Sequence, residues 1–304
     1  MTKTIITVNI SQPPENQPTA VHNRWHPEIP AVATVKPGED FRVECIDWTG
    51  GQIKDNDSAE DVKNIDLTRV HYLSGPIAVE GAEPGDLLVV DILDIGCLPN
   101  AEWGFTGIFA KENGGGFLTE HFPNANKAIW DLKGSFATSR HLPKVRIAKT
   151  IHPGLIGCAP SAALLAEWNR RESALVSTCP HRIPPLACLP ATQGALLGNV
   201  KKEHFDRIAQ EAARTIPPRE HGGNCDIKNL SLGSRTYFPV YIPNAHLSLG
   251  DLHYSQGDGE IAFCGAIEMA GGWIHLRVDL IKKGMEKYHV INPIIIPGPP
   301  NPAY

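Results

Sequence analysis

The chain has 304 residues, of which 42% are hydrophobic and 20% are charged, values near the globular average that exclude a disordered or fibrous protein. Its net charge of -5 provides no extended positive field for phosphate groups, so we expect no nucleic-acid partner. No window approaches the roughly 20 apolar residues of a membrane span, and the start, MTKTIITVNI, lacks the apolar core of a signal peptide. These features predict a soluble protein that acts on a small molecule or binds a protein partner.

Short runs of alternating apolar and polar residues, separated by 28 glycines and 26 prolines, predict that β-strands dominate the chain. In chain order, the strands are expected at residues 40–48, 87–95, 144–151, 236–243, 259–269 and 273–281. The pattern is typical of a mainly β sandwich or barrel.

Two segments have helical rather than strand periodicity. Residues 159–176 offer Pro160 and Ser161 as a helix start, followed by good helix formers. Residues 202–218 place apolar side chains on one face, and we expect the prolines at 217 and 218 to end this helix. The proline-rich tail, INPIIIPGPPNPAY, is expected to be extended rather than packed.

The chain is expected to have a β-rich N-terminal part, residues 1–150, and a second part, residues 151–304, with the helices and the site motifs. We expect the two parts to form one intertwined catalytic unit. The seven cysteines form no C-x-x-C pair and are odd in number, which is typical of a reducing compartment and predicts a cytoplasmic protein.

Potential metal ligands and acid-base groups are concentrated in two stretches. EHGGNCDIKN (220–229) places His221, Asn224, Cys225 and Asp226 around a Gly-Gly pair that lets the backbone approach a ligand closely. Asp226 and His221 are candidates for a third ligand beside the second stretch.

The second stretch, SLGDLHYSQGDGE (248–260), contains Asp251, His253, Gln256, Asp258 and Glu260. Asp251 and His253 are two residues apart and lie on one side of an extended segment, where a carboxylate and an imidazole can bind one cation.

Each of these residues also has a purely structural interpretation. Asp258 suits a hairpin turn, Asp251 can cap a turn through its own backbone, and His253 can be a hydrogen-bonded structural histidine. The number of such groups in one short stretch, next to a second group of the same kind, favours a functional site.

Long segments of the sequence resemble the acetamidase/formamidase family, most of all its fungal formamidases. The resemblance is carried by SGPIAVEGAEPGDLLVVDILDI (74–95), HPGLIGCAP (152–160), HGGNCDIKNL (221–230), SLGDLHYSQGDGE (248–260) and CGAIEMAGG (264–272). It implies hydrolysis of a very small amide, formamide to formate and ammonia. It also implies a mainly β fold, a jelly-roll sandwich plus a barrel-like part, with a few helices and α+β elements.

The resemblance implies that Asp226, Asp251 and His253 bind a divalent metal, zinc in preference to calcium. His221, Asn224, Gln256 and Glu260 would line the same pocket.

We expect the metal to polarise the substrate carbonyl and to make hydroxide available from a bound water. Glu260, or failing that Glu268, would transfer the proton to the leaving nitrogen. His221, Asn224 and the backbone N–H groups of Gly222 and Gly223 would hold the oxyanion. Gln256 and Glu268 would also contact the substrate.

Two departures from the family's pattern bear on activity. Family members continue beyond the position of Tyr304, which predicts a C-terminally shortened chain, and TIPPREHGG (215–223) is shorter than the usual lead-in to its loop. Loss of a terminal segment would expose core or open the pocket.

Two alternatives remain open. In the first, Cys225 beside His221 and Asp226 is the nucleophile of a cysteine amidase. In the second, the chain is a non-catalytic β-sandwich binding module whose acidic loop holds Ca²⁺, an ion that His253 would suit poorly.

A further stretch, GGQIKDND (50–57), is read first as a polar surface loop and second as a lid over the pocket. Exposed β edges and the tail favour a homo-oligomer.

Overall fold

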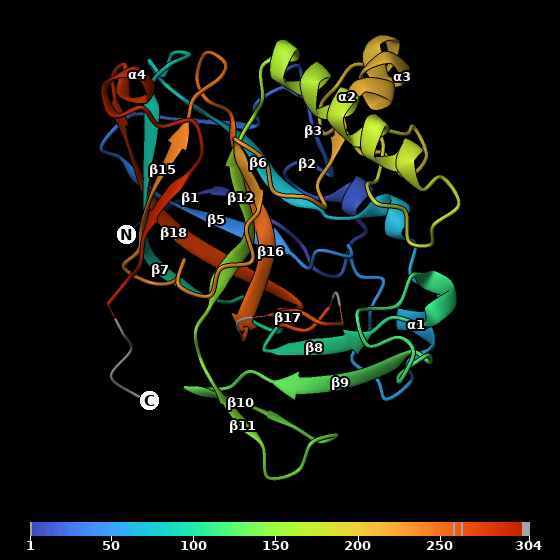
Figure 1. Ribbon diagram of the computed structural model, residues 1–304. Helices are drawn as coiled ribbons and strands as arrows, with labels where there is room; N and C mark the ends of the chain where they lie inside the picture. Colours follow the sequence, from blue (N-terminus) through green and yellow to red (C-terminus); the bar gives the residue numbers. More distant parts are fainter. Residues whose placement is uncertain (1, 258, 263, 300–304) are drawn as a thin grey trace.

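A computed structural model describes residues 2–257, 259–262 and 264–299 of the chain. Two large sheets form its framework (Figure 1), which confirms the prediction of a mainly β fold. The six-stranded sheet has the order β1 (Lys3–Ile6), β5 (Asp40–Ile46), β18 (Gly271–Ile281), β7 (Leu87–Cys97), β15 (Arg235–Pro239) and β19 (Ile294–Ile296).

The second sheet has eleven strands. Its main path is β11 (Arg146–Ala148), β10 (Phe136–Ser139), β9 (Asn126–Asp131), β8 (Trp103–Ile108), β17 (Ile267–Met269), β16 (Leu247–Ser255), β12 (His152–Cys158) and β14 (Gly222–Asn224). Beside this path, β6 (Leu73–Val79) pairs with β16, β2 (Val21–His22) and β4 (Ala33–Val35). A separate two-stranded ribbon joins β3 (Arg24–Trp25) to β13 (Ala213–Arg214).

The main hydrophobic core lies between the two large sheets. It combines Val43 and Leu276 of the six-stranded sheet with Ile156 and Leu249 of the eleven-stranded sheet, all of them buried. Each sheet therefore buries one face against the other, as in a sandwich. Both sheets contain strands from residues 1–150 and from residues 151–304.

The described residues include four α-helices, and α2 and α3 lie together on one side of the sheets (Figure 1). The helix α2 (Ala162–Thr178) begins as predicted, because the Ser161 side chain accepts a hydrogen bond from Leu164 N. The helix α3 (Lys202–Glu211) ends earlier than predicted, because Ala213 and Arg214, one residue further along the chain, form β13. The short helices are α1 (Glu60–Lys63) and α4 (Gly284–Tyr288). No helix in the described ranges is both long and apolar enough to cross a membrane.

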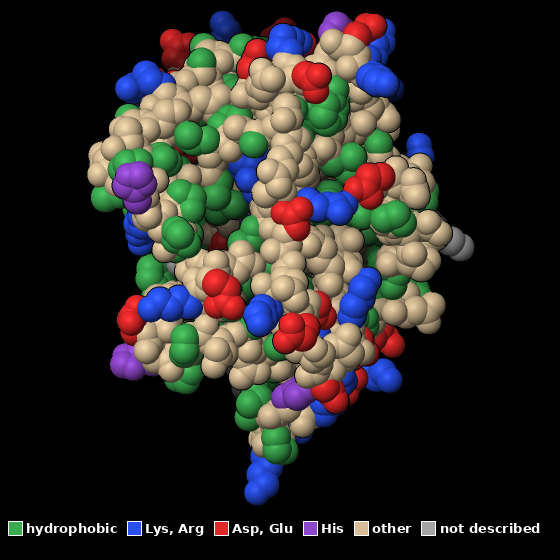
Figure 2. Space-filling view, turned by 90° about the vertical axis from the view of Figure 1, so that its right-hand side faces the viewer, with side chains coloured by type: hydrophobic (Ala, Val, Ile, Leu, Met, Phe, Trp, Pro, Cys, Tyr) green, Lys and Arg blue, Asp and Glu red, His purple; other side chains and the backbone are tan. Residues whose placement is uncertain are grey.

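Two predictions of extended structure need correction. Residues 259–269 form a strand only over Ile267–Met269, and the described residues before it form a loop. The described part of the tail, residues 291–299, is extended as predicted, but Ile294–Ile296 also pairs with β15 and so becomes the edge strand of its sheet. On the face of the molecule drawn in Figure 2, acidic and basic side chains are scattered among hydrophobic ones.

Candidate active site

Strand β16 carries two of the predicted ligands. Asp251 and His253 lie on this strand and are almost fully buried, at 4% and 1% exposure. Asp251 has a left-handed backbone with φ of 53°, an uncommon conformation for a side-chain-bearing residue that occurs often at functional sites. The pairing with β17 is also irregular between His253 and Ser255, so this strand is not a regular ladder.

The third predicted ligand comes from the loop after β14. Asp226 also has a left-handed backbone, with φ of 48°. The loop is held against β12, because the N–H groups of Cys225 and Asp226 both donate to the carbonyl oxygen of Gly154, at 2.8 and 3.1 Å. The glycine at this position leaves room for the site, as a Cβ there would lie 2.5 Å from Asp251 Oδ2 and 2.9 Å from His253 Cε1.

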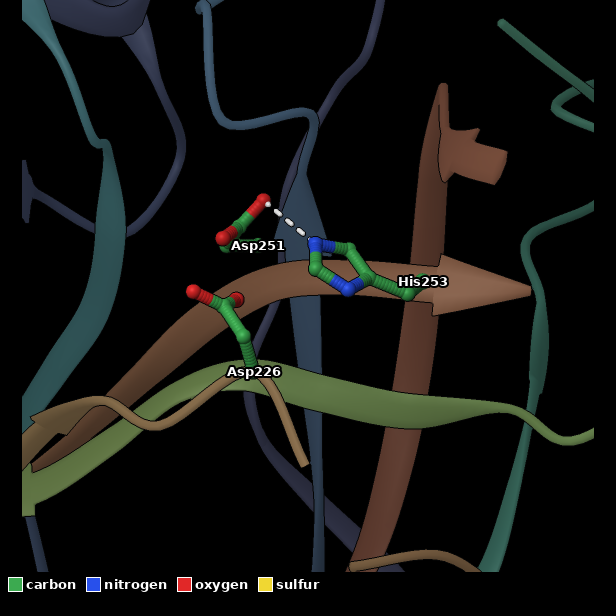
Figure 3. A group of neighbouring side chains, drawn as sticks. All are labelled: Asp226, Asp251 and His253. Atoms are coloured by element: carbon green, nitrogen blue, oxygen red, sulfur yellow. Dashed lines mark ion pairs between the residues drawn. The ribbon is translucent and has the colours of Figure 1, made fainter. Parts of the chain in front are cut away.

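Asp226, Asp251 and His253 converge as Figure 3 shows. Each offers a ligand atom, and these atoms all lie within 4.8 Å of one another. His253 Nε2 lies 3.3 Å from Asp251 Oδ1 and 3.1 Å from Glu268 Oε2. Glu268, on β17, is 3% exposed and lies opposite His253 in the sheet register. The structure thus brings together four predicted site residues, of which three are buried and Asp226 is half-buried.

These four residues include three carboxyl groups and only one imidazole, so acidic groups outnumber the basic one. Burial and the charge of Asp251 raise the pKa of Asp226 to about 7. Burial raises the pKa of Glu268 to about 8, to which the charge of Asp251 adds.

Burial opposes the charged form of Asp251 and of His253, but the charge of His253 on Asp251, and the charges of Glu268 and Asp251 on His253, outweigh it. The pKa of Asp251 lies below its ordinary value, and that of His253 lies well above. Two buried carboxyl groups, of Asp251 and Glu268, and the half-buried one of Asp226 surround one imidazole, a donor set that a divalent cation fits by charge and by ligand type.

The far side of the His253 ring faces Gln256. His253 Nδ1 lies 3.1 Å from Gln256 Oε1, and the same oxygen lies 2.9 Å from His152 Nε2. His152 is fully buried on β12, and its ring meets that of His253 edge to face with centroids 5.2 Å apart. Its Nδ1 lies 2.7 Å from the carbonyl oxygen of Thr150. Burial lowers the pKa of His152 to about 4.

A further histidine near this group had no motif to predict it. His71 is held by the Thr215 hydroxyl, whose oxygen lies 2.7 Å from His71 N and 3.0 Å from Nδ1. Its neighbour Tyr72 places a carbonyl oxygen against Gly250, the residue before Asp251. Burial lowers the pKa of His71 to about 4, although the charge of Asp251 opposes this shift.

Glu260 and Asn224 lie at the margin of the group. Glu260 is half-buried, and its Oε1 accepts hydrogen bonds from Gly265 N at 3.0 Å and Ala266 N at 3.4 Å. Asn224 Nδ2 donates to Ile216 O at 2.9 Å, and its Oδ1 is buried without a partner. Asp258 lies outside the described residues.

His221 and the two glycines after it have a different setting. The His221 ring packs against Trp25 and Trp168, with centroid distances of 4.6 and 4.5 Å, and neither ring nitrogen has a hydrogen-bond partner among the described residues. Gly222 and Gly223 pair with β12, and Gly222 N donates to Arg219 O at 3.0 Å. The structure does not place His221 with the cation ligands, and the Gly222 N–H is already bonded.

Two other predicted features can now be located. Burial raises the pKa of the Cys225 thiol to about 12, which opposes formation of a thiolate. In the stretch 50–57, Asp55 and Asp57 form ion pairs with Arg140, at 3.0 and 2.7 Å.

The chain is similar to known proteins over nearly its whole length. The model of the Acetamidase/Formamidase family matches residues 7–304. A formamidase from Methylophilus methylotrophus is 61% identical over 302 residues, covering 99% of this chain and 74% of the relative. An acetamidase from Mycolicibacterium smegmatis is 57% identical over 312 residues, covering 100% and 77%. A fungal relative, a candidate formamidase from Schizosaccharomyces pombe, is 55% identical over 304 residues, covering 99% and 74%.

A solved structure has the same fold as this chain. The structure of a gamma lactamase from Delftia acidovorans superposes with a TM-score of 0.96 at 59% identity, covering 99% of this chain and 74% of that one. The motifs, the mainly β fold and these relatives together mean that the chain belongs to the acetamidase/formamidase family.

Proposed function

We propose that the chain hydrolyses a short linear amide, formamide to formate and ammonia, at a divalent cation held by Asp226, Asp251 and His253. The observation that carries this proposal is the convergence of these three ligand atoms within 4.8 Å, with Asp251 and His253 buried and Asp226 half-buried. A zinc ion there would supply a Lewis acid for the substrate carbonyl and for the attacking water. Formamide has few groups besides its carbonyl and its amide, so the enzyme gains little binding energy from parts of the substrate away from the reacting atoms. Electrostatic stabilisation of the transition state therefore has to lower the barrier.

We assign the proton transfer to Glu268, with Glu260 as the alternative. Glu268 is buried, and its Oε2 lies 3.1 Å from His253 Nε2. In Glu260, by contrast, Oε1 already accepts hydrogen bonds from the N–H groups of Gly265 and Ala266. In this role Glu268 accepts the proton of the attacking water and delivers it to the leaving nitrogen, which departs as ammonia. Asn224 has a second amide hydrogen with which to stabilise the oxyanion.

The choice between formamide and acetamide depends on the room for one methyl group. Such a group changes selectivity by about 1 to 3 kcal/mol through pocket shape. Formamide is the smaller substrate, and the burial of the ligand group favours it.

Compartment and assembly also belong to this proposal. All seven cysteines are free thiols, which supports a reducing, cytoplasmic location. We expect a homo-oligomer, which light scattering on the purified protein measures directly.

The test is ammonia release from formamide by the protein as purified, after chelation, and after addition of Zn²⁺. Activity that disappears on chelation and returns with Zn²⁺ supports the proposal. Activity that survives complete chelation contradicts the metal-dependent mechanism. Hydrolysis of acetamide in the same assay, at a rate above that of formamide, would reverse the proposed substrate preference.

A further inference from the structure

The side-chain amide of Gln256 lies between two buried histidines, only one of which belongs to the proposed cation site. Gln256 Oε1 is 3.1 Å from Nδ1 of His253 and 2.9 Å from Nε2 of His152. The sequence alone suggests that Gln256 contacts the substrate. In the structure, both histidine contacts are made by the carbonyl oxygen of its amide.

The position of the hydrogen on the His253 ring determines which atom of the Gln256 side-chain amide must face it. A histidine that binds a cation through Nε2 has its hydrogen on Nδ1, so this N–H needs an acceptor. The Gln256 carbonyl oxygen is the acceptor within reach. Outer partners of this kind fix the ring orientation and the tautomer of metal-binding histidines.

His152 supplies the second half of the arrangement. Its Nδ1 faces the Thr150 carbonyl oxygen at 2.7 Å, and since a carbonyl only accepts, the hydrogen of the neutral ring lies on Nδ1. Its Nε2 then offers a lone pair to Gln256 and needs a donor. A primary amide has one acceptor and one donor group. The Gln256 oxygen faces both rings here, and a turn of the amide lets Gln256 accept from His253 with this oxygen and donate to His152 with its NH₂.

We propose that Gln256 is a positioning residue of the cation site, which His152 orients so that its carbonyl oxygen holds His253 with Nε2 free to bind the cation. This inference rests on the proposed function, because it presumes that a cation binds at His253. Gln256 is not itself a ligand, and its effect passes through the His253 ring.

The test is Zn²⁺ affinity, measured on the full chain without substrate by competition with a chelator of known affinity. Gln256→Leu removes the acceptor and should raise the dissociation constant about 10- to 100-fold. Gln256→Glu keeps an acceptor oxygen and should bind Zn²⁺ at least as tightly as the wild type. The matched control is Gln210→Leu, at an exposed position on α3, which should leave affinity unchanged.

A double-mutant cycle separates positioning from simple packing. His152→Phe should weaken Zn²⁺ binding in the wild type but cause no further loss in Gln256→Leu, because His152 acts through Gln256. In the zinc-loaded protein, ¹⁵N spectra should show the His253 hydrogen on Nδ1 in the wild type and in Gln256→Glu. Thermal unfolding of each variant establishes that it is folded.

The outcomes are distinct. Wild-type affinity in Gln256→Leu, equal losses in the Leu and Glu variants, or additive effects of His152→Phe and Gln256→Leu would each overturn the positioning role. If Gln256→Leu does not fold, weakened binding by Gln256→Glu still overturns it. A wild-type chain that binds no divalent cation refutes the proposed metal site itself, and this inference falls with it.

Discussion

Gly154 and Asp251 are packed so closely that a single added carbon would reach the carboxylate, with a Cβ on Gly154 only 2.5 Å from Asp251 Oδ2. Real Cβ atoms do not approach that closely, so the side chain would have to move. The absence of a side chain on β12 therefore determines where a ligand on β16 can lie.

We expect Gly154→Ala to displace Asp251 and His253 and to lower both the zinc content and the amidase activity by 10-fold or more, as loss of ligand geometry does. The zinc content of the purified variant, by elemental analysis, checks this. Gly257→Ala is the control, because its Cβ would meet nothing within 4 Å. Normal zinc content in Gly154→Ala would show that the close packing does not constrain the site.

Replacing the two candidate proton carriers should separate their roles. Glu268→Gln removes the buried acid-base group and should lower kcat by about 100- to 10,000-fold. Glu260→Gln keeps an oxygen for Gly265 N and should lower kcat less than about 10-fold. Ammonia release at saturating formamide measures both, with zinc content as the control. The reverse order of effects would assign the proton transfer to Glu260.

Cys225→Ser tests the cysteine-nucleophile alternative. Because burial raises the pKa of this thiol to about 12, we expect no thiolate at neutral pH and activity within about threefold of the wild type. Iodoacetamide should modify the exposed Cys179 without loss of activity, which mass spectrometry and the ammonia assay together record. Inactivation that coincides with modification of Cys225 would favour the nucleophile instead.

The buried His22 predicts a pH dependence of stability outside the catalytic group. Its Nδ1 lies 2.8 Å from Arg24 O and its Nε2 2.8 Å from Ser248 Oγ, and burial lowers its pKa from 6.5 to about 4. Between these values the unfolded chain binds more protons than the folded chain. Stability therefore falls as the pH decreases from 6.5 toward 4, by about 3 kcal/mol from this residue.

Urea unfolding at several pH values measures this effect. The His22→Gln variant should lose less stability over that pH range than the wild type, although it is less stable at pH 7. The exposed His204→Gln on α3 should keep the wild-type slope. An unchanged slope in His22→Gln would mean that other groups account for the acid lability.

Local sequence signals predicted several elements because their causes are local. Strand β18 follows from strict alternation, and the start of α2 follows from the Ser161 cap. The end of α3 was wrong because Ala213 and Arg214 pair with β3, about 190 residues away in the chain, and no local signal reports such a partner.

For the candidate site as well, the sequence predicted the residues that lie close together in the chain and missed those that come from distant segments. Asp251 and His253 were found from their spacing, yet they lie on an irregular strand with a left-handed residue, not on the straight segment that was assumed. Gly154, His152 and His71 were missed as site residues because strand pairing, and not sequence proximity, brings them to β16. The glycine of HPGLIG, in a strand beside a candidate ligand strand, was the one available signal.

Strand β16 is buried at all nine of its residues and is hydrogen-bonded to β6, β12 and β17. Amide hydrogens in such a strand exchange with solvent only when much of the molecule opens. The slowest-exchanging amides of the protein and two of its three proposed cation ligands, Asp251 and His253, should then belong to the same segment. Substitutions in β16 would consequently reduce the amount of folded protein in the cell as well as its turnover, so specific activity has to be normalised to folded protein.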